Sequence, residues 1–295
     1  MTGPLVVGLD GSPGSVTAAW WAADEAARRR LPLVLLHSWT TQPLDVPIPQ
    51  EALSKQRYGR NLLRQTAAEL LHRHGDLAVT TELVRDAAAP ALLERGENAS
   101  VLVLGSRGHG SMASFLLGSI SLHVLGLAPC PTVTVRAGDP AVETGWGHPA
   151  AAERDEVVVG VSEPGPASDA LLEFALVTAE SYGVGVRAVW ARPHNTPHSA
   201  PPEPADGRRE PAGRTRLTAA VDRWREKFPD VPVTQEVVTE PAANALLSAA
   251  TRARLTVVGR RHRPSHLTWK LGPVAHAVLH HAPCPVAVVP HDADG

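Results

Sequence analysis

The sequence predicts an α/β fold in two tandem domains, and three observations lead to that prediction. The run LVVGLD at residues 5–10 returns as VVVGVS at 157–162, and APCP at 128–131 returns at 282–285. The length of 295 residues suits two domains. Within each copy, short apolar runs alternate with longer segments of helical spacing or composition. We therefore expect each copy to form an open parallel sheet of five strands with helices on both faces.

The elements of the first copy follow one another as strand, helix, strand. Five runs are expected to be strands: Leu5–Leu9, Leu33–Ser38, Ala78–Val84, Val101–Leu104 and Thr132–Val135. Four segments between them are expected to be helices: Val16–Arg30, Gln50–His74, Ala89–Asn98 and Ser119–Leu127. The matching runs of the second copy predict a second sheet of the same kind.

Glycine and proline mark the segment that joins the copies. Residues 137–155 contain several of both, which suits a linker. We predict domains at residues 1–138 and 156–291, with a linker at 139–155. Two further proline-rich stretches, Thr40–Pro49 and Arg192–Gly213, are expected to be surface loops, and a functional lid is the alternative.

Composition and charge exclude several classes of protein. A net charge of −2 gives no general reason to bind nucleic acid or an anionic membrane. Two cysteines are too few for a disulfide framework or a four-ligand zinc site, so Cys130 and Cys284 are expected to be packing residues, with redox activity as the alternative. No apolar stretch approaches the roughly 18 residues that a transmembrane helix needs. We expect a soluble, cytoplasmic protein.

Small and polar residues follow the first and fourth strands of the first copy. Asp10 ends the first apolar run, while Gly105 and Gly108 follow the fourth, and Gly118-Ser119 comes after nine more residues. Ligands of open parallel sheets bind at this edge, and glycine lets them approach the backbone. The start of the last helix would offer phosphate free N–H groups, a hydroxyl and a positive dipole end. The carboxylate of Asp10 could accept hydrogen bonds from a sugar or a base, although it could instead simply cap the first helix.

This Gly-x2-Gly-x9-Gly-Ser pattern resembles the nucleotide-binding motif of the universal stress proteins, and the repeat resembles their tandem form. The runs VGLDGS at 7–12, LHS at 36–38 and APCP at 128–131 are similar to further landmarks of that family. The resemblance implies strand order 3-2-1-4-5 and binding of an adenine nucleotide, ATP, with or without magnesium. It implies these binding residues: Gly8, Asp10, Ser38, Gly105, Arg107, Gly108, Gly118, Ser119, Ile120 and Ser121.

The same resemblance assigns each of these residues a place around the nucleotide. Asp10 would lie near adenine and ribose, Ser38 would lie beside adenine through its backbone, and Gly105 would lie near ribose. The remaining motif residues, from Arg107 to Ser121, would surround the phosphates.

The second copy departs from the motif at its informative positions. Asp10, Gly108 and Ser119 of the first copy correspond to Ser162, His262 and Pro273 of the second. A short hydroxyl replaces a carboxylate, a side chain fills the place of a glycine, and proline removes an N–H from a helix start. We expect the second copy to be a structural or regulatory half without bound nucleotide.

Three function classes follow from these patterns. The favoured one is an ATP-binding stress-response or signalling protein, in which nucleotide on the first domain changes conformation or the choice of a regulatory protein partner. A weak ATPase and a scaffold that binds no nucleotide are the alternatives. The chain has no Gly-x4-Gly-Lys-Ser/Thr motif, which argues against efficient phosphoryl transfer. Homodimer formation is left open.

Overall fold

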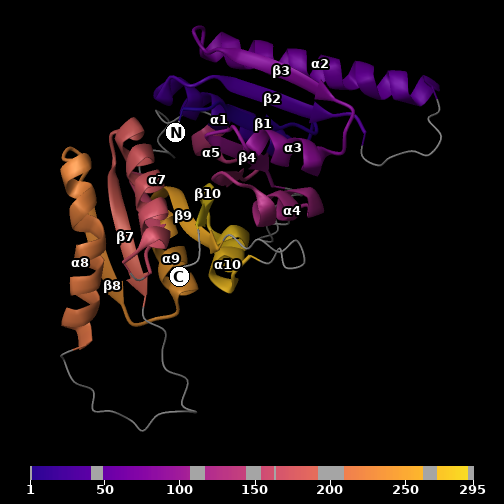
Figure 1. Ribbon diagram of the computed structural model, residues 1–295. Coiled ribbons are helices and arrows are strands. Elements are labelled where there is room, and N and C mark those ends of the chain that lie inside the picture. Colours follow the sequence, from indigo (N-terminus) through magenta and orange to yellow (C-terminus); the bar gives the residue numbers. More distant parts are fainter. Residues whose placement is uncertain are drawn as a thin grey trace. The chain divides into compact units, whose positions relative to one another are not determined.

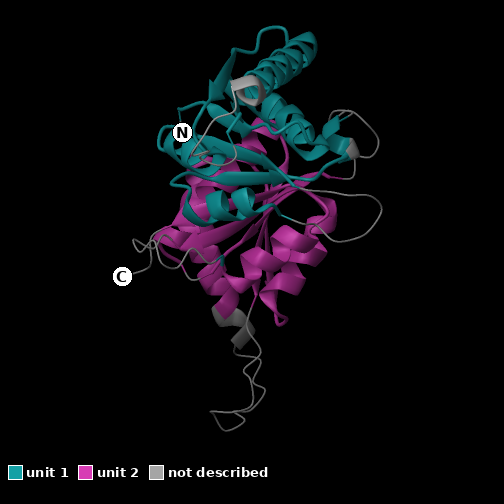
Figure 2. Cartoon of the chain, turned by 90° about the vertical axis from the view of Figure 1, so that its right-hand side faces the viewer, with its two compact units in different colours: residues 1–152, 266–271 teal, residues 153–265, 272–295 magenta. Residues whose placement is uncertain are grey.

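The computed structural model describes residues 2–40, 49–106, 117–143, 154–162, 164–191, 209–261 and 271–291. Figure 1 shows the course of the chain. The chain separates into two compact units, coloured in Figure 2, and the division falls after residue 152. Each unit is an α/β layer structure, which confirms the predicted fold class.

The sheet of the first unit contains five parallel strands in the order β3-β2-β1-β4-β5. These are β1 (Leu5–Gly8), β2 (Leu33–Ser38), β3 (Val79–Val84), β4 (Val101–Gly105) and β5 (Thr132–Val135). Val7 of β1 lies opposite Leu35 of β2 on one side and Val103 of β4 on the other. The chain leaves β1 in one direction and returns to β4 on the other side, so the edge between them is the switch point of the sheet.

Two helices cover each face of this sheet. α1 (Pro13–Arg29) contacts α2 (Pro49–Arg73) on one face, while α3 (Ala88–Gly96) contacts α4 (Ser119–Leu127) on the other. α1 begins at Pro13, earlier than the predicted Val16, because Ser12 is its N-cap and accepts a hydrogen bond from the Ser15 N–H at 3.3 Å. Proline at the first helical position suits such a start.

The beginning of the predicted linker contains a further helical turn, α5 (Pro140–Glu143). Its Ala141 and Val142 are fully buried, and α5 contacts α1. Thr17 of α1 donates a hydrogen bond to Glu143 Oε1 at 2.9 Å. Burial of two apolar side chains explains why these residues are ordered against the first unit.

The second unit repeats the arrangement with the strand order β8-β7-β6-β9-β10. Its strands are β6 (Glu156–Gly160), β7 (Gly185–Ala191), β8 (Val233–Val238), β9 (Ala253–Arg261) and β10 (Val286–His291). α7 (Pro166–Tyr182) and α8 (Arg209–Lys227) contact each other, as do α9 (Ala242–Ala249) and α10 (Pro273–His281). A 3-10 turn, Ala250–Arg252, joins α9 to β9.

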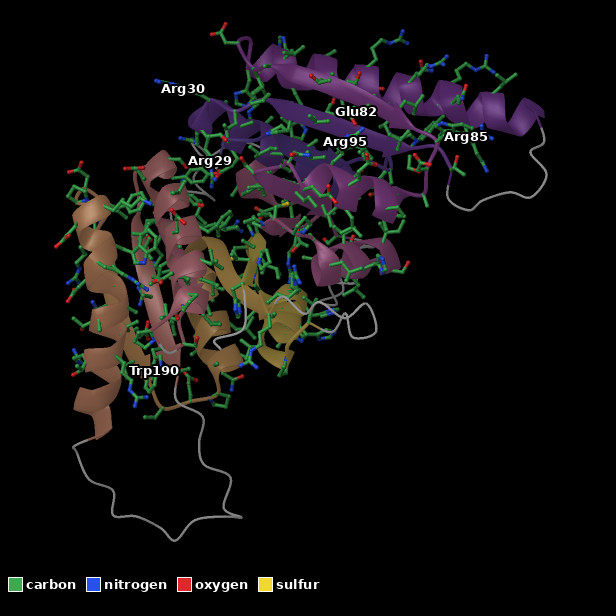
Figure 3. The ribbon with its side chains drawn as sticks, viewed as in Figure 1. Arg29, Arg30, Glu82, Arg85, Arg95 and Trp190 are labelled. Atoms are coloured by element: carbon green, nitrogen blue, oxygen red, sulfur yellow. The ribbon has the colours of Figure 1, made fainter. Side chains whose placement is uncertain are left out.

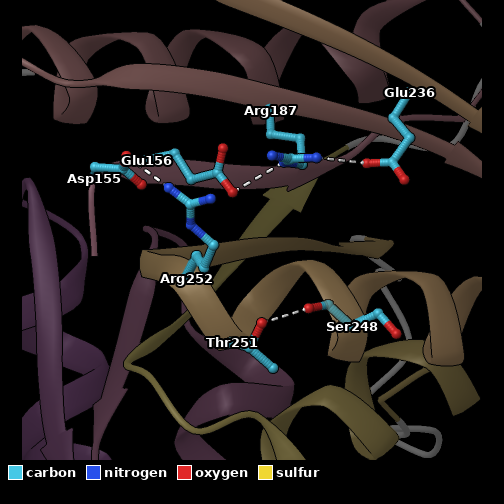
Figure 4. A network of polar contacts seen from close by, with 7 residues as sticks. All are labelled: Asp155, Glu156, Arg187, Glu236, Ser248, Thr251 and Arg252. Carbon is cyan, nitrogen blue, oxygen red and sulfur yellow. Dashed lines mark hydrogen bonds and ion pairs between the residues drawn. The ribbon is translucent and has the colours of Figure 1, made fainter. Parts of the chain in front are cut away.

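The third strand of each unit, β3 or β8, has a glutamate at the same position, and the two glutamates form ion pairs with different elements. In the second unit, Arg187 of β7 bridges Glu156 at 2.9 Å and Glu236 of β8 at 3.0 Å (Figure 4). The hydrogen bonds that Arg187 donates to these two carboxylates raise its pKa. In the first unit, Glu82 of β3 instead meets Arg95 of α3 at 2.7 Å (Figure 3). The sheets are therefore alike in topology and different in the polar pairs along them.

Within the described ranges, none of the helices has both the length and the hydropathy that crossing a membrane requires.

Candidate functional site

A cavity opens at the carboxyl ends of β1, β2 and β4 in the first unit, at the switch point of the sheet. Seven of the sequence-predicted site residues line it: Gly8, Asp10, Ser38, Gly105, Gly118, Ile120 and Ser121. Ser119 opens α4 and is exposed, but it is not among the described residues that line the cavity. Arg107 and Gly108 lie outside the described residues.

The loop between β1 and α1 holds Asp10 at the cavity through a set of short-range hydrogen bonds. Asp10 Oδ1 accepts from the Ser12 N–H at 2.9 Å, and the Asp10 N–H donates to Ser15 Oγ at 3.3 Å. Ser15 Oγ in turn donates to the Ser12 carbonyl at 2.9 Å. The N-cap of α1 is Ser12 rather than Asp10. The carboxylate of Asp10 therefore forms a local turn and lies exposed at the cavity wall.

The start of α1 packs directly on the end of β4, backbone against backbone. A side chain at Gly105 would fall on the backbone of Gly14 and Ser15, and a side chain at Gly14 would fall on the carbonyl of Ser106. The absence of a side chain at Gly105 is thus required by helix packing, a reason that the sequence alone did not reveal. This close approach brings Ser12 and Ser15 to the same cavity as Gly105.

The start of α4 presents backbone N–H groups, and its N-cap residue has no side chain with which to cap them. Its N-cap is Gly118, with φ −66° and ψ 157°, and it makes no side-chain cap hydrogen bond. Gly118, Ile120 and Ser121 all line the cavity. The first N–H groups of a helix have no partner inside the helix and lie at its positive dipole end. This end of the cavity is therefore suited to an anion such as phosphate.

Another part of the cavity wall is apolar. Leu36 of β2 together with Ala88 and Leu92 of α3 line it, next to Ser38. Ser38 Oγ donates to the Asp86 carbonyl at 2.6 Å, which ties the end of β2 to the segment that leads into α3. The cavity measures about 80 Å³, so a ligand the size of a nucleotide would extend beyond it along the sheet edge.

Behind the β1–α1 loop lies a group of residues that sequence reasoning missed. His37 Nδ1 lies 2.7 Å from the Leu9 carbonyl, and its ring packs edge-on to Tyr58 with 6.1 Å between ring centres. The Tyr58 hydroxyl occupies the space of a side chain at Gly11, where φ is +83°. A side chain at Gly59 would fall on His37. The signal in the sequence was the isolated glycine inside a helical pattern, which indicates a close approach.

The second unit differs at the corresponding edge. Its α10 has a similar N-cap, Gly272 with φ −62° and ψ 157°, but Pro273 then replaces the first N–H donor. Ser162 stands at the end of β6, and its hydroxyl lies 3.4 Å from that of Ser168. The space over Gly259 is filled by the imidazole of His291 rather than by helix backbone. His262 lies outside the described residues.

A metal site needs several ligating side chains in one place, and a reactive thiol needs access to solvent. Among the described residues, no group of three or more His, Cys, Asp and Glu side chains is placed to hold a metal ion. Cys130 and Cys284 are both buried, and neither is in a disulfide bond. Their burial fits the packing role that the sequence indicated for them.

Comparison with known proteins gives a consistent result over both copies. The profile of the universal stress protein family matches residues 1–136 and 153–290. A universal stress protein of Mycobacterium tuberculosis is 32% identical over 292 residues, which cover 96% of each chain. A solved universal stress protein from Archaeoglobus fulgidus shares the fold at a TM-score of 0.74 and 19% identity, covering 97% of this chain and 98% of its own. Another, solved in complex with dAMP, aligns with 45% of this chain and 96% of its own, at 20% identity and a TM-score of 0.35.

Proposed function

The chain belongs to the universal stress protein family, in a tandem form with two copies, and on this premise we propose that its first unit binds ATP. The proposed site is the cavity at the carboxyl ends of β1, β2 and β4. Bound nucleotide would change the conformation of the protein or its affinity for a regulatory partner. We place this role in the cytoplasm, a compartment in which the thiols of Cys130 and Cys284 stay reduced.

The observation that carries the proposal is that one cavity combines two unlike surfaces. One is the helix start at Gly118, and the other is an apolar wall that includes Ala88 and Leu92. A nucleotide has the same division, because its base is planar and largely apolar on its faces while its phosphates are anionic. Asp10 follows β1, the strand between β2 and β4, and would accept a hydrogen bond from the sugar.

The proposed contacts extend beyond the residues that line the cavity. Ser119 would supply the first N–H of α4, and Arg107 and Gly108 would complete the phosphate loop. Magnesium, where bound, would be held by the phosphate oxygens and the Asp10 carboxylate rather than by a cage of protein ligands. The protein residues would bind and orient the nucleotide, which fits a switch better than rapid turnover.

Calorimetric titration with ATP, on protein first stripped of nucleotide, tests this proposal. Gly118→Ala is the informative variant, because its φ of −66° is open to alanine and the new methyl would meet the ligand rather than strain the backbone. We expect its ATP affinity to fall about tenfold, or about 1.4 kcal/mol. Gly272→Ala is the matched control in the second unit, where a side chain meets nothing within 4 Å. It should leave binding unchanged.

Failure of the unaltered protein to bind ATP would contradict the proposal and would favour a scaffold. Equal affinities of the two glycine variants would place the nucleotide elsewhere.

A further inference from the structure

The outward side of α2 carries a straight line of exposed side chains that takes no part in the nucleotide cavity. α2 contacts β2 and β3, and its Leu63, Thr66 and Leu70 are buried (Figure 1). On the exposed side, spacings of three or four residues align six side chains: Leu53, Arg57, Arg60, Arg64, Ala68 and Leu71. We call these six the α2 stripe. At 1.5 Å per residue it is about 27 Å long.

Among the residues that the structure describes, none pairs an acidic side chain with the three arginines of the α2 stripe. Within the described part of the chain, Arg57 and Arg60 take part in no hydrogen bond or ion pair. Arg64 donates only to the neutral Asn61 side chain, at 2.9 Å. Guanidinium groups spaced in this way form a local positive field on a protein whose net charge is −2.

On the equivalent helix of the second unit, three basic side chains form ion pairs. On α8, Arg225 pairs with Asp222 at 3.0 Å and Lys227 pairs with Glu173 at 2.8 Å. Arg223 of the same helix pairs with Asp169. Over the described residues, the unpaired arginines of the α2 stripe thus have no counterpart in the ion-paired cations of α8.

Apolar side chains stand at both ends of the α2 stripe. Leu53 is 64% exposed and Leu71 is 40% exposed. They are two of only four large apolar side chains that are exposed in the described part of the chain, and Tyr58 of α2 is a third. Exposed leucines that flank a row of unpaired arginines present both the apolar and the charged component of a protein interface.

We propose that the α2 stripe docks an acidic helical segment of a partner protein. Carboxylates on that segment, spaced three and four residues apart, would meet the three arginines, and apolar residues at its ends would cover Leu53 and Leu71. A membrane fits less well, because the broad apolar face of α2 is already buried on the sheet and two distant leucines cannot anchor it. Nucleic acid would leave the leucines uncovered.

A designed peptide tests the stripe without knowledge of the natural partner. The probe is a fluorescent helical peptide of about 22 residues, long enough to span the stripe, with glutamates opposite the three arginines and a leucine near each end. We expect the full-length protein to bind it, with affinity that falls as salt rises. The double variant Arg57→Glu and Arg60→Glu should weaken binding at least tenfold, and Leu53→Ser should weaken it several-fold.

The control carries the same change in charge outside the stripe. Arg30 and Arg85 are exposed arginines of the first unit (Figure 3), and their double replacement by glutamate should leave peptide binding nearly unchanged. Thermal unfolding checks that each variant remains folded. Absence of peptide binding, an equal loss in both double variants, or binding of phosphatidylserine vesicles or duplex DNA in place of the peptide would overturn the proposal. The assay uses no nucleotide, so its outcome is independent of ATP binding.

Discussion

Gly14 in the first unit and Ala167 in the second occupy the same position of equivalent helices, yet their surroundings differ. α1 and α7 both begin at a proline, and both end on a left-handed C-cap residue, Arg30 or Gly183. Gly14 allows α1 to touch the end of β4 through backbone atoms. Ala167 carries a methyl group, and in the second unit the space over Gly259 is taken by His291. The two helices thus differ by one methyl group at this position, and the glycine at the end of the neighbouring strand is covered by helix backbone in the first unit and by a histidine side chain in the second.

The first residues of α4 and α10 differ in the hydrogen-bond donors that they offer. Gly118 and Gly272 have nearly the same backbone angles, and both leave the helix start uncapped. Ser119 retains its N–H, whereas Pro273 has none. The comparison teaches that two domains can share the same strand order and helix geometry while one of them lacks a group that would face an anion.

The largest effect on stability and binding is expected when Gly14 of the first unit is replaced by alanine, the residue that the second unit has at position 167. The methyl group of Gly14→Ala would fall on the Ser106 carbonyl, so α1 must move away from β4. We expect a loss of about 1–3 kcal/mol in the free energy of unfolding together with loss of ATP binding. Urea unfolding and calorimetry measure the two effects. The reverse change, Ala167→Gly, should lower the free energy of unfolding by at most about 1 kcal/mol and leave ATP binding intact. Equal effects of the two changes would contradict the proposed difference between the units.

Asp10→Ser introduces the residue that the second unit has as Ser162. Loss of a charged acceptor for sugar or base should weaken ATP binding by about 1.5–3 kcal/mol, roughly 10- to 150-fold. The fold should be little affected, because Asp10 is exposed and Ser12, not Asp10, caps α1. Calorimetric titration provides the affinity. Unchanged binding would remove Asp10 from the site.

Ser119→Pro gives α4 the first residue of α10, and it removes both the backbone N–H and the hydroxyl of Ser119. The preceding Gly118 has the extended ψ of 157° that a residue before proline prefers, and Pro273 occupies the same position in the second unit. We therefore expect unchanged stability and an ATP affinity lowered about tenfold by the loss of these donors, and Ser119→Ala, which keeps the N–H, should lower it less. Retained affinity together with retained stability would show that the start of α4 does not contact phosphate.

The smallest effect concerns Asp24 of α1, whose counterpart on α7 is Val177. Burial raises the pKa of Asp24, although Arg73 at 3.5 Å and His74 at 2.7 Å oppose the shift. The pKa of Asp24 is higher in the folded state than in the unfolded state. At pH values between these two pKa values the folded state therefore binds more protons, and the free energy of unfolding falls as the pH rises through that range. Asp24→Asn should slightly raise the melting temperature at pH 7, with a difference that shrinks toward pH 4. A difference that grows on acidification would reverse the assigned sign.

Sequence patterns located the secondary structure closely where it depends on local chemistry. β2, β5 and α4 have the bounds that were predicted, since apolar runs and helix-start residues mark them. α5 was missed because its order depends on burial of Ala141 and Val142 against distant residues. The start of α1 was placed too late because apolar spacing begins after the Ser12-Pro13 cap.

The residues around the cavity show the same limit. The motif pointed to Gly105 and Gly118, and both line the cavity. It could not show that Gly105 is also required by Gly14, since that contact joins segments distant in sequence. Nor could it show that Tyr58 and His37 support the β1–α1 loop from behind. Close contacts between segments distant in the chain give only a weak signal in the sequence, such as the single glycine at position 59 of α2.

The number of nucleotides bound per chain tests most directly the claim that one copy binds and the other does not. The losses at Ser162 and Pro273, with His262 in place of Gly108, should together weaken binding in the second unit by about 3–6 kcal/mol, roughly 10²- to 10⁴-fold. Equilibrium dialysis with labelled ATP, on full-length protein first stripped of nucleotide, should therefore saturate near one ATP per chain. Saturation near two would contradict the account, because the second unit would then bind ATP without the groups on which the first is proposed to depend.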